Sequence, residues 1–179
     1  MGELVIAVGH TFCHCSNMQY VMKEKWLAPG NDFAITDNSG REVYYVDGRA
    51  FSLGDKLSFR DAGGREVAFI RQRLLSWGPT YEVTRDGQHV ATVKKKLFTL
   101  LRHRFSVDVP GPNDLEAKGD FFEHEYEFLL RDRAVAQVSK RWISLTDSYG
   151  IKTAEGADDI LILCCAVVID LVCHEGKDH

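Results

Sequence analysis

Residues 156–173 have the sequence GADDILILCCAVVIDLVC, in which every residue of the segment 160–169 is apolar. Asp158 is placed to cap the start of a helix, and Asp159 would complement the helix dipole. A helix of about 14 residues would be about 21 Å long, which is short of the roughly 30 Å hydrocarbon core of a bilayer. We therefore expect a buried core element over about residues 158–173. Its apolar pattern favours a helix, and its many β-branched residues leave a buried strand as the alternative.

Two kinds of functional group interrupt this apolar segment. A lone carboxylate on a core helix must be paired or must reach solvent. We expect Asp170 to lie close to solvent near the helix end, with an ion pair to Arg or Lys as the alternative. Cys164 and Cys165 lie where thiols usually behave as small, inert hydrophobes. The chain has five cysteines, clustered towards its two ends, so we expect reduced thiols and a cytoplasmic location rather than a disulfide framework.

Upstream of this segment, the chain repeats a short apolar strand, a turn with Asp and usually Gly, and a second strand. The turns lie at residues 37–40, 61–64, 85–87 and 131–133. Asp and Gly provide turn hydrogen bonds and positive φ angles, so each unit predicts a β-hairpin. Hairpins in series must either pair into sandwiched sheets or close into a barrel to remove exposed edges. Residues 110–114, Pro-Gly-Pro-Asn-Asp, predict a loop between two halves of the series.

The composition is that of an ordinary globular protein. The chain has 179 residues, is 45% hydrophobic and 27% charged, and has a formal net charge of −4. These values exclude a disordered tail, a disulfide-rich miniprotein and a polytopic membrane protein. They are compatible with one domain or two small ones.

The charges are segregated along the chain. Residues 65–104 contain nine basic and three acidic side chains, so this stretch has a net charge of +6 within an acidic protein. Strand alternation puts Lys94 and Lys96 on one face, and Arg71 and Arg73 likewise share a face. If these two strands are neighbours, their four cations line one surface.

Lys140 and Arg141 could add to this surface, and together the six cations are our candidate site for an anionic headgroup. A solvated strand surface is the alternative interpretation, because outward-facing strand positions often carry Lys and Arg.

The chain resembles the LURP-one-related family of the tubby C-terminal-like superfamily. The similarity extends from about Tyr20 to Leu171, and no single motif in it is decisive. The matching segments, in order, are Tyr20-Val21-Met22-Lys23-Glu24-Lys25, Val46-Asp47-Gly48, Leu57-Ser58-Phe59, Pro79-Thr80-Tyr81-Glu82-Val83, Val93-Lys94-Lys95-Lys96, Val109-Pro110-Gly111-Pro112-Asn113-Asp114-Leu115 and Val138-Ser139-Lys140.

The resemblance implies a mainly β protein, a closed antiparallel β-barrel of about twelve strands around a buried hydrophobic C-terminal helix. It implies a flexible N-terminal extension over residues 1–19, a barrel domain over 20–173 and a tail over 174–179. It implies no catalytic activity and no cofactor. Plant members are associated with pathogen defence, and related domains include the phospholipid scramblases and the phosphoinositide-binding tubby domain. This chain has no recognisable calcium loop before the helix and no Cys-rich palmitoylation stretch, so calcium-dependent scrambling is not expected.

Other clusters give weaker signals. His10, Cys13, His14 and Cys15 are the residue types that zinc prefers, but they are too tightly spaced to close a tetrahedron from one loop, so we expect no metal site. Glu123, Glu125 and Glu127 alternate along a predicted strand, where an exposed face is the expected interpretation. No nucleophile motif and no phosphate-binding glycine loop is present in the sequence, so we expect no enzyme.

The leading hypothesis is a non-enzymatic module that binds anionic phospholipid or phosphoinositide headgroups at the cytosolic membrane face. It would be peripheral, without an integral membrane span, and would act in signalling or in a stress or defence response. A protein-interaction scaffold is the second hypothesis. A nucleic-acid-associated regulator is the third, and it is the least expected because the basic stretch lacks interleaved aromatic residues for stacking.

Overall fold

The computed structural model describes residues 18–24, 32–48, 54–96, 104–143 and 148–174. They form twelve strands, one short 3-10 helix and one α-helix. In chain order the elements are β1 (Met18–Glu24), β2 (Phe33–Asp37), β3 (Glu42–Gly48), β4 (Lys56–Asp61), β5 (Glu66–Gln72), β6 (Thr80–Arg85), β7 (Gln88–Lys96), β8 (Arg104–Asp108), β9 (Leu115–Asp120), β10 (Glu125–Leu130), β11 (Arg133–Ser139), η1 (Lys140–Trp142), β12 (Ser148–Thr153) and α1 (Asp159–His174).

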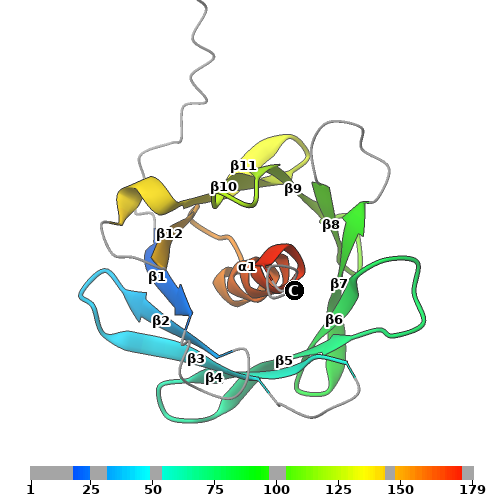
Figure 1. Cartoon of the computed structure of the whole chain (residues 1–179), viewed down its shortest axis with the longest axis horizontal. Helices are drawn as coiled ribbons and strands as arrows, with labels where there is room; N and C mark the ends of the chain where they lie inside the picture. Colours follow the sequence, from blue (N-terminus) through cyan, green and yellow to red (C-terminus); the bar gives the residue numbers. More distant parts are fainter. Residues whose placement is uncertain (1–17, 25–31, 49–53, 97–103, 144–147, 175–179) are drawn as a thin grey trace, which may run out of the picture.

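The strands form a closed antiparallel barrel in which each strand pairs with its neighbours in sequence, and β1 pairs with β12 to close the ring. Figure 1 looks into this ring and shows α1 inside it. The predicted fold, a twelve-stranded barrel around a C-terminal helix, is thus confirmed. The four predicted hairpins are β2–β3, β4–β5, β6–β7 and β10–β11.

The helix α1 resolves the choice between helix and strand for the apolar segment. Asp158 caps it as predicted, because the backbone N–H of Leu161 donates to Asp158 Oδ1 at 3.1 Å. The Tyr20 hydroxyl donates to Asp159 Oδ2 at 2.8 Å and so ties the helix start to β1. Residues 161–171 are all buried, because the barrel surrounds the helix on every side and a helix satisfies its own backbone hydrogen bonds. No helix in the described part of the chain has the length and apolar content to cross a membrane.

Each strand turns one row of side chains inward onto α1 and the other row outward. In β6, for example, Tyr81 and Val83 are buried in the core while Glu82 faces outward between them. The same alternation in β7 buries Ala91 and Val93. This period of two explains why the hairpin sequences mix apolar and charged residues.

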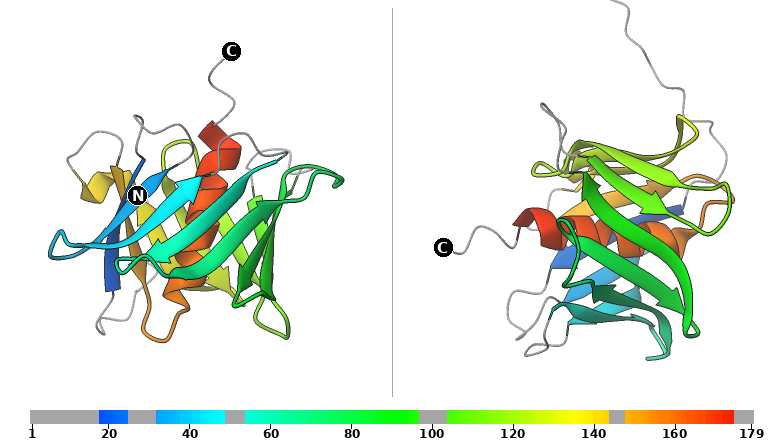
Figure 2. Two further views of the ribbon diagram at one scale, coloured as in Figure 1. Left: turned by 90° about the horizontal axis from the view of Figure 1, so that it is seen from below. Right: turned by 90° about the vertical axis from the view of Figure 1, so that its right-hand side faces the viewer.

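The two ends of the barrel differ. One end, which we call the turn rim, carries the connections at 38–41, 62–65, 86–87, 109–114 and 131–132 and the start of α1. The other end, the helix-end rim, carries the C-terminal end of α1, the connections at 73–79 and 121–124, and η1. Figure 2 shows α1 running through the barrel from one end to the other.

The structure changes three sequence-based expectations. Strand β1 begins at Met18, so the barrel starts two residues earlier than the expected boundary at residue 20. Glu123 lies in the turn before β10, so it does not share a strand face with Glu125 and Glu127. Residues 1–17 of the extension expected over 1–19, including His10, Cys13, His14 and Cys15, and residues 175–179 of the expected tail lie outside the described residues.

Asp170 is the third difference. Only 6% of it is exposed, so it is not close to solvent. Its Oδ1 lies 2.6 Å from Nε2 of His124, so the partner is a histidine from the β9–β10 connection and not an Arg or Lys. The ring of His124 stacks on Tyr149 with 4.3 Å between the ring centres. These contacts join the last turns of the helix to the barrel wall.

Candidate functional site

The strands that carry the predicted cations are not neighbours. Arg71 belongs to β5 and Lys94 and Lys96 belong to β7, with β6 between them. The condition for one shared surface, that these two strands are neighbours, is therefore not met. The physical reason is the turn at Asp86, which folds β6 onto β7 and leaves β5 on the far side of β6.

Strand β6 contributes a carboxylate between the two pairs of cations. Nη2 of Arg71 donates to Glu82 Oε2 at 2.8 Å, and Nε of Arg73 lies 3.5 Å from Glu82 Oε1. The hydrogen bond from Arg71 lowers the pKa of Glu82, which keeps the carboxylate charged. Arg71 and Arg73 thus share one anionic partner, and both side chains are more than half exposed.

Lys94 and Lys96 of β7 also have acidic partners. Lys94 Nζ lies 2.6 Å from Asp108 Oδ2, and Lys96 Nζ lies 3.6 Å from Glu116 Oε1. Glu116 also contacts Arg104 at 3.2 Å and Lys118 at 3.0 Å. Partial burial raises the pKa of Glu116, but the hydrogen bond from Lys118 and the neighbouring cations outweigh this effect and lower it.

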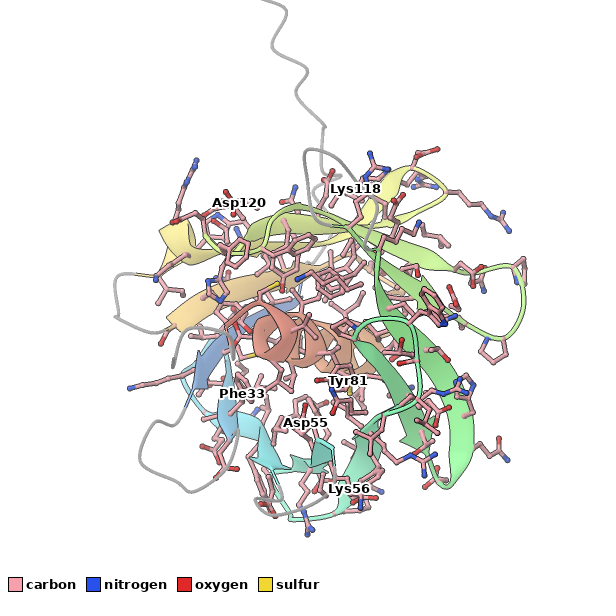
Figure 3. All side chains as sticks on the ribbon, turned by 45° about the vertical axis from the view of Figure 1, so that its right-hand side comes forward. Phe33, Asp55, Lys56, Tyr81, Lys118 and Asp120 are labelled. Atoms are coloured by element: carbon pink, nitrogen blue, oxygen red, sulfur yellow. The ribbon has the colours of Figure 1, made fainter. Side chains whose placement is uncertain are left out.

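Lys96, Arg104 and Lys118 form a row that the sequence analysis missed. Lys96 pairs with Arg104 across β7–β8, and Arg104 pairs with Lys118 across β8–β9. Arg104 was part of the predicted basic stretch, but Lys118 enters the row only through the β8–β9 register. Figure 3 shows Lys118 on the outside of the barrel, where a partner could reach it.

Lys140 and Arg141 lie apart from the other four cations. They form η1 after β11, which is six strands from β5 in the closed order of twelve. The Ser139 side chain starts this turn, because its Oγ accepts from the Arg141 backbone N–H at 3.2 Å and donates to Glu125 Oε1 at 2.8 Å. Arg141 Nε lies 3.5 Å from the same Glu125 oxygen. Within the described residues Lys140 has no ion-pair partner.

The structure brings Arg141 into a groove of about 540 Å³ on the outer wall of the barrel. Lys118 contributes a second cation to this groove, and Trp142 provides an apolar side. Glu125 and Glu127 also line it, so its charge is mixed. A second hollow of about 390 Å³ is lined by Lys96 and Arg131 but also by four carboxylates, Asp108, Asp114, Glu116 and Asp132. The excess of carboxylates makes this second hollow unsuited to an anion.

All six predicted cations nevertheless belong to the same end of the barrel. Strands β5, β7 and β11 run in the same direction, and the cations follow or occupy the last residues of each. Their backbone positions are therefore distributed around the helix-end rim, although the side chains of Lys94 and Lys96 extend along the wall to Asp108 and Glu116. Lys56, which pairs with Arg71 across β4–β5, adds to them there.

The two thiols in the middle of α1 are not activated as nucleophiles. Cys164 and Cys165 lie inside the barrel, and burial raises the pKa of both thiols, so they stay protonated. Across the part of the chain that the structure describes, no group of His, Cys, Asp and Glu side chains has an arrangement suited to a metal ion.

Comparison with known proteins agrees with this architecture. A family model described as LURP-one-related matches residues 18–170, from β1 into α1. The chain is 33% identical over 162 residues to the uncharacterized protein YxjI of Bacillus subtilis (strain 168), an alignment that covers 90% of this chain and 98% of that protein.

Among solved structures, an X-ray structure of a protein from Arabidopsis thaliana matches with a TM-score of 0.66 and 22% identity, over 86% of this chain and 90% of that one. At this identity the likeness shows the shared fold alone. The match to the family model covers most of the chain, and the chain therefore belongs to the LURP-one-related family.

Proposed function

We propose that this protein is a non-enzymatic module that binds anionic phospholipid headgroups, including phosphoinositides, with its helix-end rim. In this proposal it is a cytoplasmic protein that associates peripherally with the cytosolic face of a membrane and serves a signalling or stress response. The ligand is recognised by its phosphate charge, and no chemical step is assigned to the protein.

The observation that supports the proposal is the position of the cations at one end of the barrel. Arg71, Arg73, Lys94 and Lys96 come from two strands that point the same way, and Lys140 and Arg141 come from a third. A membrane is a flat partner, so it can contact cations on different strands at once if they lie on one rim. A compact pocket for one soluble anion would need them closer together.

The ion pairs at this rim do not prevent headgroup binding. Arg71 and Arg73 share one carboxylate, and Lys96, Arg104 and Lys118 share another, so cations outnumber their direct partners. Exposed ion pairs contribute only about 0–1 kcal/mol each, so a phosphate can replace a carboxylate at small cost. Near an anionic surface each Lys or Arg contributes about 1 kcal/mol.

Vesicle flotation tests the proposal. Phosphatidylcholine vesicles with and without a phosphoinositide would be mixed with the wild-type chain and with the double variant Lys94→Glu/Lys96→Glu. The loss of two cations alone corresponds to about 2 kcal/mol, or about a 30-fold weaker binding, and the two added carboxylates weaken it further by repulsion. The control is Arg41→Glu/Arg65→Glu, which makes the same charge change at exposed, ion-paired arginines of the turn rim.

The proposal predicts that the wild-type chain and the control float with phosphoinositide vesicles, and that the Lys94→Glu/Lys96→Glu variant does not. Added salt should weaken the binding, because the headgroup contacts are attractions between exposed charges. Equal flotation of all three chains would contradict the proposal, as would failure of the wild-type chain to bind at low salt.

A further inference from the structure

The connection between β5 and β6 exposes large apolar side chains to an unusual extent. Leu75 and Trp77 have exposed fractions of 101% and 97%, and Leu74 is 58% exposed. The other large hydrophobic side chain that is exposed in the described ranges is Phe122, at 41%, in the β9–β10 connection. Both connections belong to the helix-end rim. Single exposed apolar residues are normal, but three within four residues on one tip mark an interaction site.

The hairpin that carries these side chains is firmly anchored at its base. The backbone N–H of Arg73 donates to the Thr80 carbonyl oxygen at 2.8 Å. The Tyr81 hydroxyl donates to Asp55 Oδ2 at 2.6 Å, and Figure 3 shows Tyr81 and Asp55 side by side. The backbone N–H of Gln72 donates to the carbonyl oxygen of Asp55 at 2.9 Å, which ties β5 to the start of β4.

The tip itself is shaped by its own polar groups. Ser76 Oγ lies 2.8 Å from the carbonyl oxygen of Arg73 and 2.9 Å from that of Gly78, so its hydroxyl can donate to either. Gly78 has a φ of +87°, in the region that favours glycine. The loop therefore holds Leu75 and Trp77 outward through its backbone and Ser76, without burying them against the barrel.

The shape and charge of the hairpin indicate the class of its partner. The connection projects from the barrel (Figure 2), and its apolar side chains lie exposed at the tip. Arg71 and Arg73 lie on its β5 side, and Lys56 lies across from Arg71. The hairpin thus carries two leucines and a tryptophan at its tip and basic residues where it joins the barrel. This arrangement matches an anionic membrane surface, because tryptophan prefers the membrane interface and basic residues contact the headgroups.

We infer that residues 74–77 insert into the interfacial region of an anionic bilayer while Arg71 and Arg73 contact headgroup phosphates. This inference rests on the proposed membrane binding and adds an apolar anchor to it. Electrostatic attraction brings the rim to the membrane, and the tip then removes apolar surface from water. Binding should therefore retain a component that added salt does not abolish.

Two variants of the full chain test the insertion. Leu75→Ala/Trp77→Ala removes the most exposed apolar surface and, because both side chains are fully exposed, should leave the fold intact. We expect about 30-fold weaker binding to vesicles that contain phosphatidylserine. In the second variant, Trp26→Phe/Trp142→Phe, Trp77 is the only remaining tryptophan of the three. Its fluorescence should be quenched by vesicles whose acyl chains carry bromine.

The outcomes separate this inference from the proposed function. Vesicle binding without quenching of Trp77, and without an effect of Leu75→Ala/Trp77→Ala, would overturn insertion while headgroup binding stands. No vesicle binding by the wild-type chain would overturn both. If Leu75→Ala/Trp77→Ala abolishes self-association in sedimentation experiments but leaves vesicle binding unchanged, the tip contacts a second copy of the chain, and insertion is again wrong.

Discussion

Asp158, which caps the central helix α1, is the carboxylate that we expect to contribute most to stability. Asp158 Oδ1 accepts from the Leu161 backbone N–H at 3.1 Å and from Arg85 Nη2 at 2.6 Å, while its Oδ2 accepts from Arg85 Nη1 at 2.8 Å. One side chain thus starts the helix and joins it to the end of β6. Asp158→Ala removes both functions, whereas Asp158→Asn keeps the cap and removes the charge.

The magnitudes follow from these contacts. Loss of an Asp cap costs about 1 kcal/mol. The ion pair with Arg85 is partly exposed, so its loss costs about 1 kcal/mol rather than the larger value of a buried pair. We expect Asp158→Ala to lower the free energy of unfolding by about 2 kcal/mol and Asp158→Asn by about 1 kcal/mol. For a chain of this size these losses lower the Tm by about 4–8 °C and 2–4 °C.

Thermal and urea unfolding, followed by circular dichroism, measure these differences. The control is Glu155→Ala, which removes an exposed carboxylate from the same connection without touching the cap. The reasoning is refuted if Asp158→Ala has no larger effect than Glu155→Ala. It is also refuted if Asp158→Asn is as destabilising as Asp158→Ala, since the cap would then contribute nothing.

Three further predictions concern the barrel wall. A Cβ at Gly119, where φ is +145°, would lie 2.4 Å from the backbone oxygen of Glu125. Gly119→Ala should therefore lower the free energy of unfolding, measured in urea, by about 3 kcal/mol. A decrease smaller than that of a typical surface variant would contradict this. The buried Tyr126 hydroxyl has no hydrogen-bond partner in the described structure, so Tyr126→Phe should leave the Tm unchanged or raise it. A clear decrease in Tm would show that the hydroxyl does have a partner. Hydrogen bonding from Ser39 lowers the pKa of Asp37 to about 2. Because the unfolded pKa is near 3.9, the stabilisation is present above about pH 4 and is lost as the pH falls towards 2. The difference in Tm between the wild-type chain and Asp37→Asn should therefore shrink over this range, and a constant difference would argue against the assignment.

Local sequence chemistry was sufficient to predict most of the fold. Asp37 and Asp61 were expected to form turns, and each accepts backbone hydrogen bonds from residues two and four positions later. The Asp158 cap and the apolar period of the strands are equally local signals. The resemblance to a known family then supplied the closure of the barrel and the position of the helix inside it.

The arrangement of the candidate site depended on long-range pairing that no local signal contains. The row of Lys96, Arg104 and Lys118 exists because of the β7–β8–β9 register. Similarly, the contact between His124 and Asp170 joins residues that are 46 positions apart. The separation of β5 from β7 could have been predicted, because consecutive hairpins in a meander place β6 between them. The exposure of Leu75 and Trp77 could not be foreseen, since apolar residues are usually inside.

The central claim is that the helix-end rim is the surface that faces an anionic membrane. Amide hydrogen exchange with and without phosphoinositide vesicles tests it directly, because it locates the contact along the chain without a substitution. The account predicts slower exchange in the 73–79 connection and around Lys140 and Arg141 when vesicles are present. It predicts unchanged exchange in the turns at 38–41 and 62–65. Protection of those turns, or of neither rim, would contradict it.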